Sequence, residues 1–567
     1  MKRIKRWTLF LLIALFGFFA FQPSGDDNTD FEIAKNLDIY YTLFRELDLF
    51  YVDPIDPGKL VKTSIDKMLS TLDPYTVYIP ESKMEDYQFM TTGQYGGIGA
   101  LIQKKGDYLM ISEPYEGFPA QKNGLKAGDI MLEINGKSIK NYSITQVSEL
   151  LKGEPKSEVE IKVKREYPAE KIFTVKFARQ KVKINSVPYY GMLDSATAYI
   201  KLNQFTAGAG EEVKQALLKL KDEFQPKQLV FDLRGNPGGL LIEAINVVNI
   251  FVSKGKEIVS TKGKVASWNR DYKTPSTPVD TNIRIVVLVD RGSASASEIV
   301  SGAIQDLDRG VILGQRSYGK GLVQTTRDLS YNSKLKVTTA KYYIPSGRCI
   351  QALDYSHRNP DGSVGKIPDS LISEFKTSIG RKVYDGGGIL PDVHYDVPKY
   401  TTFVQSLVLE NAVFNFSTYF ASQIDSIAPP DKFNLPDSTL KSFSKFLEKM
   451  NFTYQSETEQ AVNKLEKISK KEKYFDSIED DIKKLQNELK EDRQKDLDKN
   501  KTDIRNFLEE EICSRFYYQK GRIQSFLSHD GEIKKAISIL NDTAYYHHIL
   551  SPGYVPPKQG NDENEDN

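Results

Sequence analysis

The chain has 567 residues, of which 40% are hydrophobic and 27% are charged. At about 100–200 residues per domain, this length predicts roughly three to five domains and more than one hydrophobic core. Lys and Arg (77) balance Asp and Glu (76), and a formal net charge of +1 gives no reason to expect a nucleic-acid partner. Two cysteines, Cys349 and Cys513, exclude a disulfide scaffold. Five histidines without an HExxH pattern argue against a zinc site.

Residues 1–24 are arranged like a signal peptide or a membrane anchor. Four basic residues come first, Lys2, Arg3, Lys5 and Arg6. The stretch 7–21 is then uncharged and almost wholly apolar, and as a helix it rises ~22 Å, less than the ~30 Å hydrocarbon core of a bilayer. We therefore expect an exported protein, either periplasmic or anchored to the inner membrane and facing the periplasm. A buried helix of a cytosolic domain is the alternative.

Residues 30–87 are predicted to form a helical module. Apolar residues recur at helical spacing over 31–52 and again over 60–72. Pro54 follows the first predicted helix and Asp73-Pro74 ends the second.

From residue 88 to residue 180 the pattern changes to short strands. Strands are predicted at 108–112, 130–134 and 159–163, with a hairpin turn at Asn135-Gly136. Helical segments are predicted near residues 119–120 and at 143–152. Such short strands, interrupted by two helices, describe a small half-open barrel.

Residues 181–398 alternate strands and helices. Strands are predicted at 228–233, 283–289 and 311–313, and helices at 239–252 and 297–307. This alternation is typical of an α/β core.

Residues 399–553 are predicted to be helical and highly charged, and residues 554–567 to be a disordered polar tail. Between Leu465 and Leu489, apolar residues fall mostly three or four positions apart, which predicts an amphipathic or coiled-coil helix. This helix either packs on its own subunit or forms a dimer interface, and the sequence favours neither.

A serine-rich turn at residues 292–298 joins a predicted strand to a predicted helix. A serine there can present its hydroxyl at the edge of the sheet, and the next amide points into the same space. Ala294 and Ala296 keep the surroundings small, so that a substrate backbone can approach. Ser295 and Glu298 also fit an N-terminal capping box, and on this segment alone capping is the favoured interpretation.

A nucleophilic Ser295 needs a base, and the candidate is Lys320, because no histidine precedes His357. Lysine ordinarily has a pKa of about 10.4, so keeping its amine neutral near pH 7 costs about 4–5 kcal/mol. Burial in an apolar site lowers the pKa of a lysine and can supply a free energy of this size. Gly319 and Gly321 flank Lys320 and admit close packing, and Gln324 could orient the amine through its side-chain oxygen. A solvated surface lysine is the alternative.

Residues 314–320 also read almost as a phosphate-binding P-loop. We reject that interpretation because Gly321 stands where a Ser or Thr should hold magnesium, and because a strand is predicted to follow instead of a helix.

A glycine turn at residues 232–239 follows the predicted strand 228–233. Gly238 or Gly239 could donate one N–H to an oxyanion, with the Ala296 N–H as the other donor. The alternative is a plain strand-to-helix turn in which glycine supplies positive φ.

Together these segments closely resemble the carboxyl-terminal processing peptidases, also called tail-specific proteases. The matching motifs are Tyr51-Val-Asp-Pro54, Leu72-Asp-Pro-Tyr75, Gly96-Gly-Ile-Gly99, residues 232–239, residues 293–298 with Ala303-Ile-Gln-Asp306, residues 319–324 and Ile389-Leu-Pro-Asp392. The resemblance implies a multidomain α+β protein. It would have the N-terminal helical module (30–87), a PDZ-like small β-barrel (88–180), an α/β serine protease core with a mixed sheet (181–398) and a helical C-terminal extension (399–553).

The resemblance also implies the site residues. Ser295 would be the nucleophile, Lys320 the base and Gln324 a support for the lysine, with the Ala296 and Gly238 amides stabilising the oxyanion.

In the PDZ domain, the amides of Gly97, Ile98 and Gly99 would bind a peptide's terminal carboxylate, and Leu101 would help line the apolar pocket. In some family members a basic residue near the end of the PDZ domain takes part in gating, and the resemblance implies Arg165 as the candidate for that regulatory role.

The sequence therefore predicts an exported serine endopeptidase that recognises free C-terminal tails and cleaves through a Ser–Lys dyad and an acyl-enzyme. No metal or organic cofactor is implied, and the partners are protein or peptide substrates with free C-termini. The N-terminal segment is a candidate membrane anchor, and the C-terminal helical region is a candidate homodimer interface. A catalytically silent PDZ-type adaptor that binds tails is the alternative, and the presence of Ser295, Lys320 and Gln324 argues against it.

Overall fold

The computed structural model describes residues 27–359, 363–493 and 495–555. The chain divides into two compact units, residues 1–78 and residues 79–567, with β1 (Val77–Ile79) at the boundary. The predictions for residues 1–24 and for all but the start of the tail at 554–567 lie outside the described residues. None of the described helices combines the length and the apolar character that crossing a bilayer requires.

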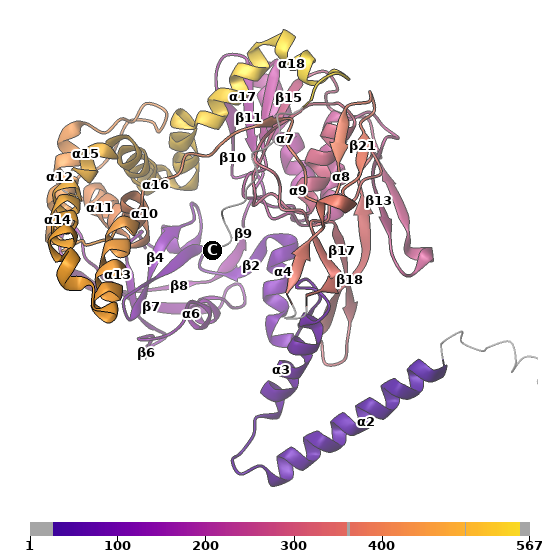
Figure 1. Ribbon diagram of the computed structural model, residues 1–567, viewed down its shortest axis with the longest axis horizontal. Helices are drawn as coiled ribbons and strands as arrows, with labels where there is room; N and C mark the ends of the chain where they lie inside the picture. The colour runs from indigo at the N-terminus through magenta and orange to yellow at the C-terminus, as the bar shows by residue number, and fades with distance from the viewer. Residues whose placement is uncertain (1–26, 360–362, 494, 556–567) are drawn as a thin grey trace, which may run out of the picture. The chain divides into compact units, whose positions relative to one another are not determined.

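Two helices make up most of the first unit, α2 (Asp27–Phe50) and α3 (Pro57–Ser70) (Figure 1). The Asp56 carboxylate caps α3 by accepting the Lys59 N–H at 3.0 Å, and Pro57 occupies the first helical position, where its missing N–H costs nothing. Both predicted N-terminal helices are confirmed.

The second unit begins with η1 (Glu81–Lys83) and α4 (Met84–Thr92) and continues into a small β-barrel. Five strands run in the order β3-β4-β5-β7-β8, β6 pairs with β5, and β2 pairs with β9. The barrel elements are β2 (Gln94–Gly97), β3 (Ala100–Lys105), β4 (Tyr108–Pro114), α5 (Pro119–Lys122), β5 (Ile130–Ile134), β6 (Lys137–Ser138), α6 (Ile144–Leu151), β7 (Glu158–Arg165), β8 (Lys171–Ala178) and β9 (Gln180–Lys183). Asn135 and Gly136 both have positive φ in the β5–β6 turn, as the hairpin prediction requires.

A six-stranded mixed sheet forms the centre of the α/β core, in the order β10-β11-β12-β15-β16-β23. In this order, each neighbouring pair from β11 through β12, β15 and β16 to β23 is parallel, and β10 is antiparallel to β11. The elements of this layer are β10 (Tyr189–Met192), β11 (Thr197–Lys201), α7 (Ala209–Phe224), β12 (Gln228–Asp232), α8 (Leu241–Phe251), β15 (Arg284–Val289), α9 (Ala296–Asp306), β16 (Val311–Gly314) and β23 (Val393–His394).

A second sheet carries β13, β14, β17 and β18. These and the remaining short elements of the core are β13 (Glu257–Lys262), η2 (Ala266–Trp268), β14 (Arg270–Lys273), β17 (Leu322–Asp328), β18 (Lys334–Tyr343), β19 (Leu353–Arg358), β20 (Val364–Lys366), η3 (Asp369–Leu371), β21 (Glu374–Lys376) and β22 (Lys382–Tyr384). The strand that the sequence predicts directly after Lys320 is confirmed as β17.

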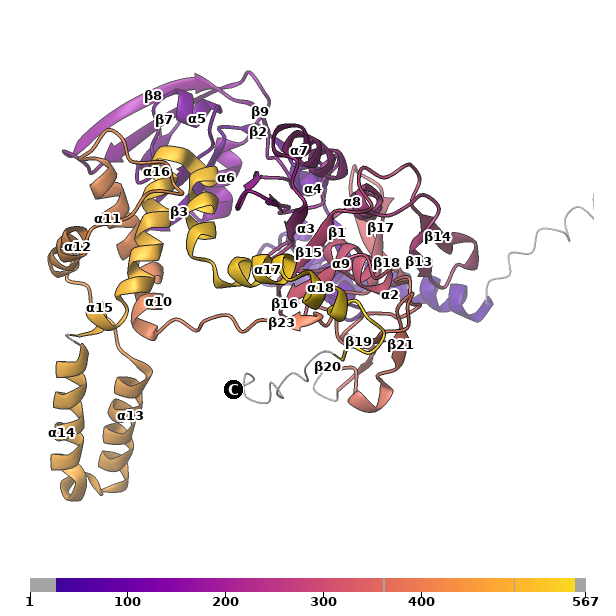
Figure 2. The ribbon, with the colours of Figure 1, turned by 90° about the horizontal axis from the view of Figure 1, so that it is seen from above.

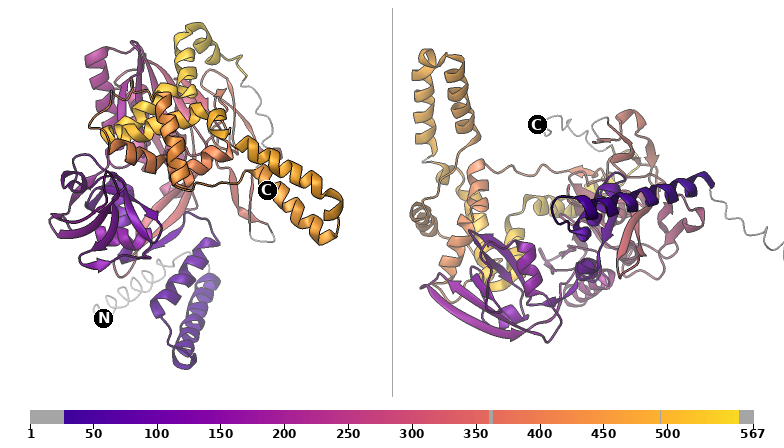
Figure 3. Two further views of the ribbon diagram at one scale, coloured as in Figure 1. Left: turned by 90° about the vertical axis from the view of Figure 1, so that its left-hand side faces the viewer. Right: turned by 90° about the horizontal axis from the view of Figure 1, so that it is seen from below.

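The helical C-terminal region contains α10 (Thr402–Leu409), α11 (Ala412–Ala421), α12 (Asp437–Lys449), α13 (Glu457–Glu472), α14 (Phe475–Arg493), α15 (Asp496–Lys499), α16 (Lys501–His529), α17 (Gly531–Asn541) and α18 (Thr543–Ile549). The prediction of one amphipathic helix between Leu465 and Leu489 is wrong. Lys473 adopts the left-handed conformation (φ 65°), which ends α13, and the chain reverses into α14 as a helical hairpin (Figure 3).

The last two helices return to the α/β core, so the six-stranded sheet is covered on both faces (Figure 2). Side chains of α7, α8 and α9, such as Leu217 and Val248, pack on one face in one cluster with Phe231. Side chains of α17, such as Ile533, pack on the other face with Val286. Helices α17 and α18 are therefore part of the hydrophobic packing of the α/β core.

Candidate active site

Ser295 stands directly before α9, at the turn that follows β15. Its backbone has φ 55° and ψ −112°, a conformation that is costly for a residue with a Cβ and that is found mainly where function demands it. The Ala296 N–H opens the helix, and within the described part of the chain no group accepts its hydrogen bond. The turn therefore places a hydroxyl next to an available amide donor.

The glycine turn after β12 lies against this serine. A Cβ added at Gly238 would lie 2.6 Å from the Ala294 carbonyl oxygen and 2.9 Å from both the Ala296 nitrogen and the Ser295 Cβ. Gly238 also has φ 98°, so only glycine fits this position. The structure thus brings together two segments that the sequence marks separately.

The Gly238 N–H donates to the Asn236 Oδ1 at 2.9 Å. Its carbonyl accepts the Phe205 N–H at 3.0 Å. The N–H of the next residue, Gly239, has no acceptor among the described residues.

Glu298 connects the serine turn to the loop that carries Lys320. One oxygen of its buried carboxylate, Oε2, accepts the backbone N–H of Ser295 at 2.7 Å and that of Lys320 at 2.9 Å. The other oxygen, Oε1, accepts the Ser317 hydroxyl and the Gly319 N–H, both at 2.6 Å. The backbones of Ser295 and Lys320 therefore share a single carboxylate oxygen.

All four of these partners donate to Glu298, so the carboxylate form satisfies them best. Burial raises the pKa of Glu298, and the four hydrogen bonds act in the opposite direction. The sequence pattern indicated only a capping role for Glu298. That role is present, since its side chain accepts the Ser295 N–H, but the contacts to residues 317–320 extend it to the whole site.

Lys320 is half-buried and precedes β17, whose residue Gln324 lies on the same strand. The Gln324 amide nitrogen donates to the Thr338 Oγ1 on β18 at 3.2 Å. This bond turns the amide so that its oxygen is the end able to accept from an ammonium group.

The glycine turn contributes Arg234 to a buried ionic network. Arg234 pairs with Asp232 at 2.7 Å and with Asp530 and Glu532, both at 2.8 Å. Burial opposes ionisation of Asp232, but the charges of Arg234 and Lys201 outweigh it and lower the pKa of that carboxyl. Burial raises the pKa of Glu532 to about 7. Because Asp530 and Glu532 lie at the α16–α17 junction, the C-terminal region contacts the glycine turn through Arg234, a contact that the sequence did not reveal.

The residues predicted for peptide binding lie in the small barrel. Gly97, Ile98 and Gly99 link β2 to β3, and Gly99 has φ 72°, with Phe118 so close that an added Cβ would lie 2.4 Å from the Phe118 Cβ. Ile98 is buried, whereas Leu101 on β3 is 49% exposed and available to an apolar ligand.

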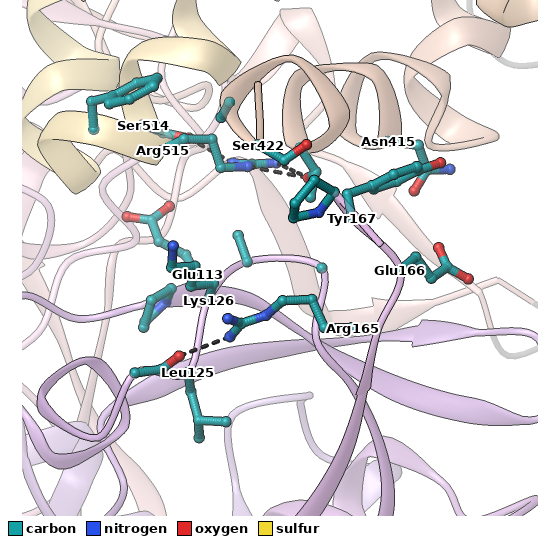
Figure 4. Close-up of a pocket in the computed structure, with 18 of the residues that line it drawn as sticks. Glu113, Leu125, Lys126, Arg165, Glu166, Tyr167, Asn415, Ser422, Ser514 and Arg515 are labelled. Carbon is teal, nitrogen blue, oxygen red and sulfur yellow. Dashed lines mark hydrogen bonds between the residues drawn. The ribbon is translucent and has the colours of Figure 1, made fainter. Parts of the chain in front are cut away.

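Arg165 ends β7 and is held inside the same domain. Its Nε donates to the Asp129 Oδ1 and its Nη2 to the Asp129 Oδ2, each at 2.6 Å. It lines a cavity of about 540 Å³ between the barrel and the helical region. Figure 4 shows Arg165 and Glu113 on the barrel side of this cavity and Arg515 on the helical side.

Three family models match successive parts of the chain. "PDZ domain" matches residues 110–165, "Peptidase family S41" matches residues 196–361, and "Probable PDZ-protease, C-terminal helical domain" matches residues 403–540.

Curated relatives match over most of the chain. A "Probable CtpA-like serine protease" of Staphylococcus aureus (strain COL) is 32% identical over 81% of this chain and 83% of its own. A "Carboxy-terminal-processing protease" of Bartonella bacilliformis is 34% identical over 62% of this chain and 77% of its own. Among solved structures, the photosystem II D1 C-terminal processing protease is 29% identical over 64% of this chain and 88% of its own, with a TM-score of 0.34. The chain belongs to peptidase family S41, as a CtpA-like, carboxy-terminal-processing serine protease with a PDZ domain.

Proposed function

We propose that this serine protease is an exported endopeptidase that selects proteins by their free C-terminal tails and cleaves them with a Ser295–Lys320 dyad. The observation that carries the dyad is the Glu298 carboxylate, which accepts hydrogen bonds from the backbones of both residues. Gly238 packs against Ser295 and Ala296, so the glycine turn borders the proposed site.

In the proposed reaction, the neutral amine of Lys320 takes the hydroxyl proton of Ser295 while the Ser295 Oγ attacks the scissile carbonyl carbon. The carbonyl π electrons move to oxygen, and the resulting oxyanion is bound by backbone N–H groups. When the C–N bond breaks, the Lys320 ammonium returns the proton to the leaving amine. Water, deprotonated by the same amine, then hydrolyses the acyl-enzyme and restores the Ser295 hydroxyl. Gln324 supports the lysine through its side-chain oxygen.

For the oxyanion we assign the Ala296 N–H and a donor from the glycine turn. The Gly238 N–H already donates to Asn236, so Gly238 serves either through a shared hydrogen bond or after a small rotation of the turn. The Gly239 N–H is the alternative donor from the same turn. One such donor is typically worth about 100–1000-fold in rate.

The PDZ domain is proposed to bind the tail, with Gly97, Ile98 and Gly99 at the carboxylate and Leu101 at the last side chain. Arg165, between the barrel and the helical region, is a candidate for coupling tail binding to the protease.

The proposed export rests on the basic and apolar pattern of residues 1–24, and that segment is a candidate anchor to the inner membrane. The α13–α14 hairpin, with Leu465, Ile468 and Leu485 more than 40% exposed, is a candidate homodimer contact.

Hydrolysis of β-casein by the purified full chain, beside its Ser295→Ala variant, tests the proposal. Cleavage by the parent and none by Ser295→Ala is expected. Equal cleavage by both would refute the nucleophile, and no cleavage by either, with tail binding intact, would favour the silent adaptor.

A further inference from the structure

Tyr342 lies near the end of β18 and is almost completely buried, with 1% of its surface exposed. Its strand pairs with β17 on one side and with β13 on the other, where Tyr342 lies opposite Thr261. Its ring belongs to the same hydrophobic cluster as Ala296, the first residue of α9. The backbone of Tyr342 is therefore held by the sheet and its ring by the core.

Two hydrogen bonds connect Tyr342 to the two parts of the proposed dyad. Its hydroxyl donates to the Ser295 carbonyl oxygen at 3.2 Å. Its backbone N–H donates at 3.0 Å to the carbonyl oxygen of Gly321, the residue after Lys320. Glu298 joins the same two segments through their N–H groups, whereas Tyr342 joins them through their carbonyl groups. Both backbone polar groups of Ser295 are thus bound by residues that also bind the lysine loop.

The Ser295 carbonyl belongs to the same peptide group as the Ala296 N–H, the proposed oxyanion donor. Because a peptide bond is planar and trans, the orientation of the C=O sets the direction of the N–H. The carbonyl also accepts the Glu298 and Ile299 N–H groups, each at 2.9 Å. Those two donors belong to α9 itself, whereas the Tyr342 hydroxyl comes from a different sheet. The hydroxyl therefore fixes this peptide plane relative to the strands beside the lysine loop.

The backbone of Ser295, with φ 55° and ψ −112°, is of a kind that persists only where the surroundings determine it strongly. We infer that Tyr342 is a positioning residue of this protease. Its hydroxyl directs the Ala296 N–H at the developing oxyanion, and its backbone N–H holds the Lys320 loop at the same site. This inference rests on the proposed function and adds a residue that acts through Ser295 and Ala296.

Tyr342→Phe removes the hydroxyl and keeps both the ring and the backbone hydrogen bond. An internally quenched peptide, carrying a site at which the parent cuts β-casein, gives kcat and KM. We expect kcat to fall about 10- to 100-fold, less than for complete loss of an oxyanion donor, because the Ala296 N–H remains but is less well oriented. KM should stay within about two-fold of the parent's, since Tyr342 is not assigned to substrate binding.

Tyr546→Phe is the matched control. Tyr546 is also buried, and its hydroxyl also donates to a backbone carbonyl, that of Ile285, at 3.2 Å. It lies on α18, in the cluster on the other face of the six-stranded sheet. Both variants should lose a similar amount of stability in urea, since each loses a hydrogen bond of a buried hydroxyl. Tyr546→Phe should keep its kcat, because a structural role changes the unfolding midpoint alone.

A kcat of Tyr342→Phe within about two-fold of the parent's, or an equal loss of kcat in Tyr546→Phe, would overturn the inference. Ser295→Ala in the same assay separates this inference from the proposed function. Cleavage by Ser295→Ala at the parent's rate would refute the dyad, and this inference with it. An inactive Ser295→Ala beside a fully active Tyr342→Phe would overturn the positioning role alone.

Discussion

Gly238 lies so close to Ser295 that a Cβ added to the glycine would come within 2.9 Å of the serine's own Cβ. The two residues come from separate strand-to-helix turns, after β12 and after β15. Because β12 and β15 are parallel neighbours in the sheet, both turns leave from the same edge. That arrangement puts amide donors and a hydroxyl within one small space.

Gly238→Ala should therefore damage both the fold and the activity. The added methyl group meets backbone atoms that cannot move away, and the residue keeps an unfavourable φ of 98°. We expect about 1–3 kcal/mol lower stability from the strain and a loss of kcat of at least about 100-fold, because the oxyanion donors shift. Thermal unfolding and peptide cleavage measure the two effects.

Gly255→Ala is the matched control, since Gly255 also has positive φ but an added Cβ there meets nothing within 4 Å. It should lose some stability and keep its kcat. Full activity in Gly238→Ala would contradict the placement of the turn in the site.

Glu298→Gln should uncouple the serine turn from the lysine loop. The amide NH₂ of glutamine cannot accept the N–H groups that now share the carboxylate, so at least one buried donor loses its partner, at about 1–3 kcal/mol. Displacement of the reacting groups by a fraction of an ångström to 1 Å should lower kcat about 100-fold. Single-turnover cleavage and unfolding by urea would be compared.

Glu243→Gln provides the control for this substitution. Glu243 lies on α8, and its carboxylate also accepts two backbone N–H groups, from Gly208 at 3.1 Å and from Gly210 at 2.8 Å. It should lose similar stability with kcat retained. Equal loss of kcat in both variants would mean that Glu298 acts only through general stability.

Glu532 should make stability depend on pH. Burial raises its pKa from 4.5 to about 7, so between those pH values the folded state holds a proton that the unfolded state has released. Its contribution is complete below about pH 4.5 and is lost as the pH rises through 7. Relative to Glu532→Gln, which mimics the protonated acid, the parent should lose up to about 3 kcal/mol over this range.

Urea unfolding of the parent and of Glu532→Gln at several pH values from 4.5 to 8 measures the difference. A difference that stays constant, or that favours the parent more as the pH rises, would contradict the burial of a proton-binding carboxyl at the α16–α17 junction.

Local sequence signals predicted the elements around the site well. The β-branched run at 283–289 corresponds closely to β15. The helix predicted from residue 143 begins there as α6, where Ser143 and Gln146 form a reciprocal cap. These succeed because alternation, capping and turn chemistry act over a few residues. The roles of Ser295 and Lys320 came instead from the resemblance, since capping was the favoured local interpretation of Ser295.

Long-range contacts were beyond local signals. The pairing of Arg234 with Glu532 joins residues 298 positions apart, and no pattern near either residue indicates it. The reversal at Lys473 was missed because a lysine, without Gly or Pro nearby, takes the left-handed conformation. Glu298 was recognised as a cap, but its bonds to the Lys320 loop depend on how the two loops fold together.

Turnover of β-casein by Lys320→Met tests the central assignment most directly. Methionine keeps much of the length and packing of lysine but cannot take a proton. We expect a loss of kcat of at least about 1000-fold with an unchanged unfolding midpoint. Lys341→Met, on the adjacent strand β18 where Lys341 pairs with Leu322, should retain its kcat. Turnover by Lys320→Met within a few-fold of the parent would contradict Lys320 as the base.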